Sequence, residues 1–145
     1  MFKIRSLDHV GLRVTDREGA ARFFAGLGFR PEPGEDAPEH SALGLINDAG
    51  VRLNLIYNAS PPPGGANVLM DVADKWPGWT HAAFVVDDLD ALLAWLRAEN
   101  VRVTEGPVVY GDGRRRVCFI RDADGNVIEF NQILARQVPG QETAA

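Results

Sequence analysis

Cysteine is nearly absent from this sequence, with Cys118 as its one example in 145 residues. A single cysteine excludes an intramolecular disulfide and a thiolate zinc cluster, so any metal centre here needs histidine, carboxylate or amide ligands. We interpret Cys118 as a small apolar residue of a strand, because free cysteine is usually buried.

Long hydrophobic runs and an excess of positive charge are also lacking. No apolar run reaches the roughly 20 residues that a membrane helix needs, and residues 1–5 lack the apolar stretch of a signal peptide. We therefore expect a cytoplasmic protein with no membrane partner. The 20 acidic residues outnumber the 15 basic ones, which gives a net charge of −5. Because nucleic-acid binders need a basic surface, we expect no nucleic-acid partner.

The residues that are present favour one folded domain. Hydrophobic residues make up 46% of the chain and charged residues 24%, as in soluble globular proteins. We expect residues 1–145 to form a single domain, since this length supports one core but not two ordinary domains.

The first half begins with a strand and a helix. Apolar residues alternate along residues 7–14, which places His9 on the face opposite to Val10 and Leu12. A capping-box spacing starts at Thr15, and phenylalanine and leucine then recur at helical spacing. These signals predict a helix over about residues 16–27.

Later segments of the first half predict strands and then a linker. Residues 29–38 hold three prolines, and we expect them to interrupt regular structure. Residues 41–47 and 51–58 predict a hairpin across a turn that ends at Gly50. The Pro61–Gly65 segment has the composition of an extended linker.

The second half repeats this order. A strand is predicted over residues 79–88, and leucines at helical spacing follow up to Leu96. Short strands are predicted over residues 101–103, 115–121 and 126–133.

An offset relates the two halves. Adding 72 to His9 gives His81, and three further residues bring Asn54 onto Glu129. The economical interpretation is an α+β fold of two strand-helix-three-strand modules. These modules cover about residues 5–58 and 79–133.

Four polar residues lie on the side of the predicted strands that faces away from the helices. They are His9, Asn54, His81 and Glu129. Two imidazoles and a carboxylate bind Mn, Fe, Co, Ni or Zn while leaving coordination positions open for chemistry. An amide such as Asn54 is a weaker oxygen donor, suited to a supporting position.

These residues resemble the vicinal oxygen chelate superfamily, which includes glyoxalase I, methylmalonyl-CoA epimerase, extradiol dioxygenases, fosfomycin-resistance enzymes and bleomycin-resistance proteins. The resemblance rests on the segments around His9 and His81, on residues 23–29, and on residues 119–130. It implies two βαβββ modules whose mixed sheet forms a cup around a divalent metal, commonly in a homodimer.

The resemblance also implies roles for single residues. His9, His81 and Glu129 fall where the superfamily places metal ligands, and Glu129 is also a candidate catalytic group. Asn54 stands where glyoxalase I and the epimerases have Glu or Gln. Because an amide cannot act as a base, we predict that Asn54 supports substrate binding.

Other residues are candidates for handling substrate. Alternation sends at least one arginine of Arg114–Arg116 toward the cup, where Arg114 or Arg116 could bind a substrate carboxylate or phosphate. Trp79 could form a pocket wall. Tyr110 is a candidate catalytic side chain, and Tyr57 and His40 are further possible bases, all three by their chemistry alone.

Two functions therefore stand for this sequence. The first is a metal-dependent lyase, isomerase or dioxygenase that chelates a small substrate through adjacent oxygens. The alternative is a metal-free module that binds a small molecule or drug, similar to the bleomycin-resistance proteins. The acidic net charge would suit a cationic drug.

Overall fold

A computed structural model describes Lys3 and residues 5–61, 63–111 and 113–134. The chain divides into two compact units. Unit 1 comprises Met1–Pro77 and Asp122–Gly125, and unit 2 comprises Gly78–Arg121 and Asn126–Ala145. Among the described residues, no helix is long and apolar enough to cross a membrane.

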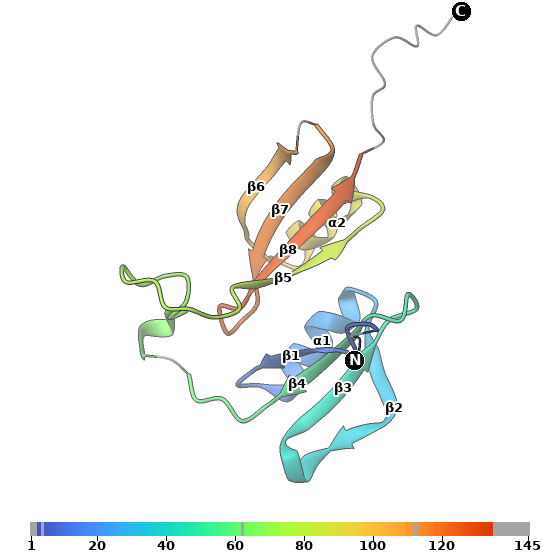
Figure 1. The fold of residues 1–145 in the computed structure, drawn as a ribbon, viewed down its shortest axis with the longest axis vertical. Helices are drawn as coiled ribbons and strands as arrows, with labels where there is room; N and C mark the ends of the chain where they lie inside the picture. Colours follow the sequence, from blue (N-terminus) through green and yellow to red (C-terminus); the bar gives the residue numbers. More distant parts are fainter. Residues whose placement is uncertain (1–2, 4, 62, 112, 135–145) are drawn as a thin grey trace, which may run out of the picture. The chain divides into compact units, whose positions relative to one another are not determined.

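Unit 1 contains a four-stranded mixed sheet with one helix across a face (Figure 1). The strand order is β1-β4-β3-β2, in which β1 and β4 are parallel and the other pairs antiparallel. Its elements are β1 (Val10–Arg13), α1 (Arg17–Gly26), β2 (Arg30–Ala37), the short 3-10 helix η1 (Pro38–His40), β3 (Ala42–Ile46), β4 (Arg52–Ile56) and the 3-10 turn η2 (Pro63–Gly65).

Unit 2 repeats this topology in the order β5-β8-β7-β6, again with one parallel pair (Figure 1). Its elements are β5 (His81–Val85), α2 (Leu89–Ala98), β6 (Val103–Tyr110), β7 (Arg115–Arg121) and β8 (Val127–Ile133). The expected α+β fold of two βαβββ modules is therefore confirmed, with one four-stranded sheet in each module.

Both helices begin at an aspartate, and the two aspartates are 72 residues apart. Asp16 accepts a hydrogen bond from the Glu18 backbone, while Asp88 accepts from the backbones of Asp90 and Ala91. Such caps satisfy backbone donors that a first turn leaves without partners. The helix predicted over residues 16–27 is confirmed as α1 with its two caps.

The strand register confirms the offset between the halves. Gly11 pairs with Asn54 in the parallel β1–β4 ladder, and Ala83 pairs with Glu129 in the parallel β5–β8 ladder. Positions 11 and 83 differ by 72, and positions 54 and 129 by 75. The sequence repeat is thus a structural repeat.

Each unit buries an apolar layer between its sheet and its helix. In unit 1, Leu55 is fully buried and Phe24 of α1 is 1% exposed. In unit 2, Leu96 of α2, Cys118 and Ile120 have no exposed surface. Each buried Leu or Phe contributes about 1.5–3 kcal/mol of transfer free energy. The interpretation of Cys118 as a buried strand residue is confirmed.

Two expectations about strands were wrong. Residues 29–38 do not interrupt regular structure, because β2 runs through Pro31 and Pro33 with an irregular register between Pro31 and Asp36. The strand expected over residues 101–103 is instead β6, Val103–Tyr110. Both β2 and β6 are outer strands, where proline is tolerated because one row of backbone groups needs no ladder partner.

The turn between β7 and β8 belongs to unit 1, although both of its strands belong to unit 2. Thr15 donates its backbone N–H to Asp124 at 2.9 Å and its hydroxyl to the same carboxylate at 2.6 Å. Asn67 donates its side-chain amide to the Gly125 carbonyl at 3.0 Å. These bonds hold Asp122–Gly125 beside the start of α1.

Candidate functional site

Two of the predicted metal ligands meet in unit 2. His81 begins β5 and Glu129 lies in β8, and the two strands are adjacent and parallel. The His81 Nε2 atom lies 2.9 Å from Glu129 Oε2, with side-chain exposures of 36% and 16%. The pair is therefore reachable from solvent on the side of His81 and sheltered on the side of Glu129.

Neighbouring side chains bond the second ring nitrogen of His81 and the second carboxylate oxygen of Glu129. Thr80 Oγ1 lies 2.9 Å from His81 Nδ1, and Asn131 Nδ2 donates to Glu129 Oε1 at 2.8 Å. The Phe119 ring meets the His81 ring edge to face, with centroids 5.9 Å apart. One nitrogen of His81 and one oxygen of Glu129 are thus left facing each other.

This separation fits two ligands of one divalent metal. Ligand atoms at about 2.1 Å from a metal and at right angles to each other are about 3.0 Å apart.

His9, the third predicted ligand, lies in unit 1 just before β1. Its Nδ1 atom is 2.7 Å from Asp8 Oδ2, and its side chain is 43% exposed. Arg52 contacts Asp8 at 3.1 Å and Glu32 at 2.7 Å. The hydrogen bond from His9 and the charge of Arg52 hold the pKa of Asp8 below its ordinary value.

An ionised carboxylate can only accept hydrogen bonds, so His9 Nδ1 is the donor in this contact. A carboxylate partner of this kind fixes the orientation and the tautomer of a metal-binding histidine. Within the described ranges, no group of three or more His, Cys, Asp and Glu side chains is gathered as a metal would need. The structure thus assembles the His81–Glu129 part of the predicted ligand set.

Asn54 lies at the repeat position of Glu129, and both of its ladder partners are glycines. Its partners across the two adjacent strands are Gly11 and Gly44. A Cβ atom added to Gly11 would meet nothing within 4 Å, whereas at Gly44 it would collide with Glu35. Space therefore remains beside Asn54 on the β1 side.

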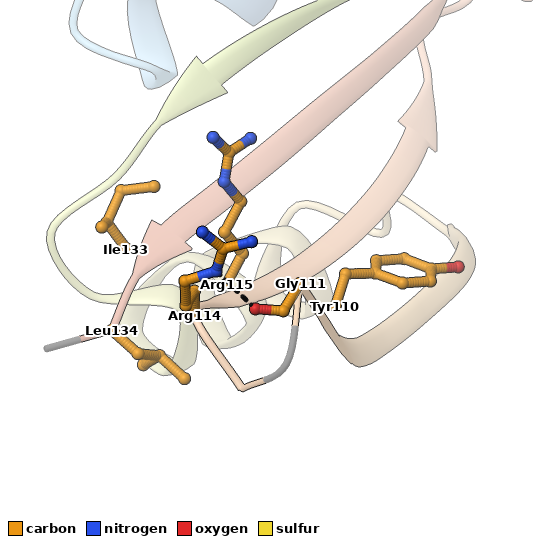
Figure 2. Close-up of a pocket in the computed structure, with 6 residues that line it drawn as sticks. All are labelled: Tyr110, Gly111, Arg114, Arg115, Ile133 and Leu134. Carbon is orange, nitrogen blue, oxygen red and sulfur yellow. Dashed lines mark hydrogen bonds between the residues drawn. The ribbon is translucent and has the colours of Figure 1, made fainter. Parts of the chain in front are cut away.

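The three consecutive arginines point to different partners. Arg116 lies on the helix side of β7 and makes two hydrogen bonds to Asp90 of α2, at 2.8 and 2.6 Å. Arg114 donates its Nε–H to the Gly111 carbonyl at 2.7 Å (Figure 2). Arg115 alternates with Arg116, so it shares the sheet face of Phe119 and Glu129.

Tyr110 and Trp79 are both exposed. Tyr110 lines an open pocket with Arg114, Arg115 and Ile133, and its ring extends away from the arginines (Figure 2). Its hydroxyl donates to Glu105 Oε1 at 3.3 Å. Trp79 is 96% exposed, two residues before His81.

The two further base candidates have other surroundings. Tyr57 lies under the guanidinium of Arg17 from α1, 5.3 Å from ring centroid to carbon, and so belongs to the helix side of the sheet. His40 is in η1 with a 77% exposed side chain. Tyr57 therefore does not face the row that contains Asn54.

A family model of the Glyoxalase/Bleomycin resistance protein/Dioxygenase superfamily matches residues 6–130. The chain belongs to this superfamily. The resemblance noted from the sequence is therefore confirmed. The superfamily includes enzymes and non-enzymatic binding proteins.

Solved structures of superfamily proteins have the same fold. A glyoxalase family protein from Bacillus cereus is 20% identical with a TM-score of 0.69, covering 92% of this chain and 97% of that one. A glyoxalase/dioxygenase from Nostoc punctiforme is 21% identical with a TM-score of 0.67, covering 90% of this chain and 92% of that one.

A third similar structure is that of TnmS3, an antibiotic binding protein from a Streptomyces species. It is 25% identical with a TM-score of 0.67, and the match covers 92% of this chain and 100% of that one. Among curated proteins, none matches this superfamily member significantly.

Sequence reasoning missed the side chains that hold the candidate ligands. Asp8, Thr80 and Asn131 each bond to a predicted ligand, and Arg52 bonds to Asp8. A signal was available for two of them, because Asp8 and Thr80 directly precede the two repeat-related histidines.

Proposed function

We propose that this chain is a metal-dependent enzyme that binds a small substrate through two adjacent oxygens. The divalent ion, Fe, Mn, Ni, Co or Zn, is held by His81 and Glu129, with His9 as the third ligand. The observation that carries the proposal is the 2.9 Å approach of His81 Nε2 to Glu129 Oε2. Superfamily membership supports it independently.

The residues of the chain have distinct tasks in this proposal. When bound, the metal supplies Lewis-acid chemistry at the substrate oxygens, as in a lyase, an isomerase or a dioxygenase. Thr80 and Asn131 orient the His81 and Glu129 ligands through the bonds described above. Asn54 binds substrate by hydrogen bonding, because its amide has no basic atom.

We propose that Arg115 binds substrate in place of Arg116, which the sequence suggested for this role. The Arg116 guanidinium is engaged by Asp90, whereas Arg115 has no ion pair among the described residues and lies on the Glu129 side of β7. Arg114, Tyr110 and Trp79 remain proposed substrate or catalytic contacts. A homodimer is proposed from the common assembly of the superfamily.

Metal analysis of the purified protein tests the proposal. We expect close to one divalent metal per chain, which His81→Ala abolishes. His40→Ala is the matched control, because it removes a histidine that is 77% exposed and whose Nε2 lies 4.0 Å from Glu39 Oε1. Equal metal content in wild type and His81→Ala would overturn the metal assignment.

A metal-free binding protein is the second candidate function. The similarity to an antibiotic binding protein and the net charge of −5 favour it, since an acidic protein attracts a cationic drug. In this case bleomycin would raise the melting temperature, while metals and chelators would leave it unchanged. The enzyme proposal predicts the opposite pattern.

A further inference from the structure

Asn131 is a buried polar residue of β8, and one of its two amide atoms has no hydrogen-bond partner in the described part of the chain. The residue is 4% exposed. Nδ2 donates to Glu129 Oε1 at 2.8 Å, but Oδ1 is buried and accepts no hydrogen bond from any residue that the structure describes. A buried acceptor without a partner destabilises a fold, because it has lost its water.

The surroundings of Asn131 do not require an amide. Its partners across the ladders are Val85 and Val117, both apolar. Subtracting the repeat offset of 75 leads to Ile56, which pairs with Arg13 and Ala42 at the equivalent place in unit 1. The same topology therefore accepts a branched apolar side chain at this position.

We propose that Asn131 is a positioning residue, whose Nδ2 fixes Glu129 Oε1 so that Oε2 faces His81 Nε2 and the incoming metal. This inference rests on the proposed metal function. A carboxylate that is already oriented through one oxygen loses less conformational entropy when its other oxygen binds a cation. The Asn131 amide thus positions Glu129 through Nδ2, while its unpartnered Oδ1 lowers the stability of the fold.

The next residue offers a matched control, since Gln132 is also an amide but points to the other face of β8. Its Oε1 accepts from the Leu89 backbone at 3.3 Å, and its Nε2 donates to the Asp87 carbonyl at 3.1 Å. Both ends of this amide stabilise the start of α2. Gln132 supports the fold and does not touch Glu129.

The test compares Asn131→Val with Gln132→Leu in the full chain, using Co²⁺ alone as the probe. We expect Asn131→Val to bind Co²⁺ about 10–100-fold more weakly and to change the Co²⁺ absorption bands. Its metal-free melting temperature should equal or exceed that of the wild type. Gln132→Leu should melt at a lower temperature and keep its Co²⁺ affinity.

Two results would overturn this inference without contradicting the proposed metal function. One is wild-type Co²⁺ affinity in Asn131→Val, and the other is a joint loss of affinity and metal-free melting temperature, which indicates a purely structural role. A wild-type chain that binds no Co²⁺ would overturn both this inference and the proposed metal function.

Discussion

His9 Nδ1 and Asp8 Oδ2 are 2.7 Å apart, and adding the repeat offset of 72 to Asp8 leads to Thr80, which bonds His81 in the same way. Each module thus places a hydrogen-bonding side chain directly before its histidine. Only Asp8 brings a charge, and Arg52 fixes it at 3.1 Å. Both imidazoles thus have an Nδ1 partner in the preceding residue, and the partner of His9 is itself held by Arg52.

Replacing Asp8 with Asn should weaken metal binding without removing a ligand. The amide can no longer provide a charged acceptor for the Nδ1 proton, so the basicity and orientation of His9 change. Loss of such a partner lowers metal affinity about 10–100-fold. Chelator competition measures the dissociation constant of the metal.

Glu39→Gln is the control for this substitution. It neutralises the acidic neighbour of the exposed His40, which lies 4.0 Å away. We expect this variant to bind metal as the wild type does. An Asp8→Asn protein with unchanged affinity would show that Asp8 does not assist His9.

The alternation of strand residues explains how far the site could be predicted. Parity alone placed His81 and Glu129 on one face, and the 2.9 Å contact agrees with it. Parity could not choose among three consecutive arginines, because the Asp90 partner of Arg116 comes from another element. The Asn131 bond to Glu129 was likewise invisible, since periodicity carries no information on side-chain pairing.

The Arg116–Asp90 pair predicts a pH-dependent contribution to stability. Two hydrogen bonds from Arg116 lower the pKa of Asp90 in the folded chain. The contribution is therefore present above the unfolded pKa, about 3.9, and is lost as the pH falls through the lower folded value. Arg116→Met should lower the free energy of unfolding at pH 7, and its difference from the wild type should shrink as the pH falls below the unfolded pKa.

Urea titrations at pH 7, 5 and 3 measure this difference. Arg114→Met serves as the comparison, because the Arg114 Nε–H bonds a backbone carbonyl and no carboxylate. We expect its effect to be the same at each pH. A constant deficit in Arg116→Met across the series contradicts the prediction.

The edge strands explain which part of the fold could not be predicted. The helices and inner strands follow from apolar periodicity and the repeat. Pro31 and Pro33 in β2, and Pro107 in β6, normally indicate a break in a strand. Both strands are outermost in their sheets, and whether a strand is outermost depends on its topology rather than on its own residues.

The buried layer of unit 2 should be sensitive to the loss of volume. Leu96 has no exposed surface, so Leu96→Ala should lower the free energy of unfolding by about 2–5 kcal/mol. Val85 is 69% exposed, and Val85→Ala should change it by less than about 0.5 kcal/mol. Chemical denaturation compares the two, and similar losses would contradict the placement of Leu96 in the core.

Cys118 should resist thiol reagents in the folded protein. Its side chain is fully buried in β7, and burial raises the pKa of its thiol. The reactive thiolate is therefore scarce at pH 8 as well as inaccessible. Ellman's reagent should label the chain only in denaturant, and rapid labelling of the native protein would contradict this prediction.

Because the turn Asp122–Gly125 belongs to unit 1, the two sequence repeats do not coincide with the two compact units. A cut through the Pro61–Gly65 linker would separate two similar peptides, but the first would lack Asp124, the acceptor of both Thr15 donors. The Thr15 donors lie in the first half of the sequence and their acceptor lies in the second. Fragments produced separately should therefore regain these native hydrogen bonds only when they are mixed.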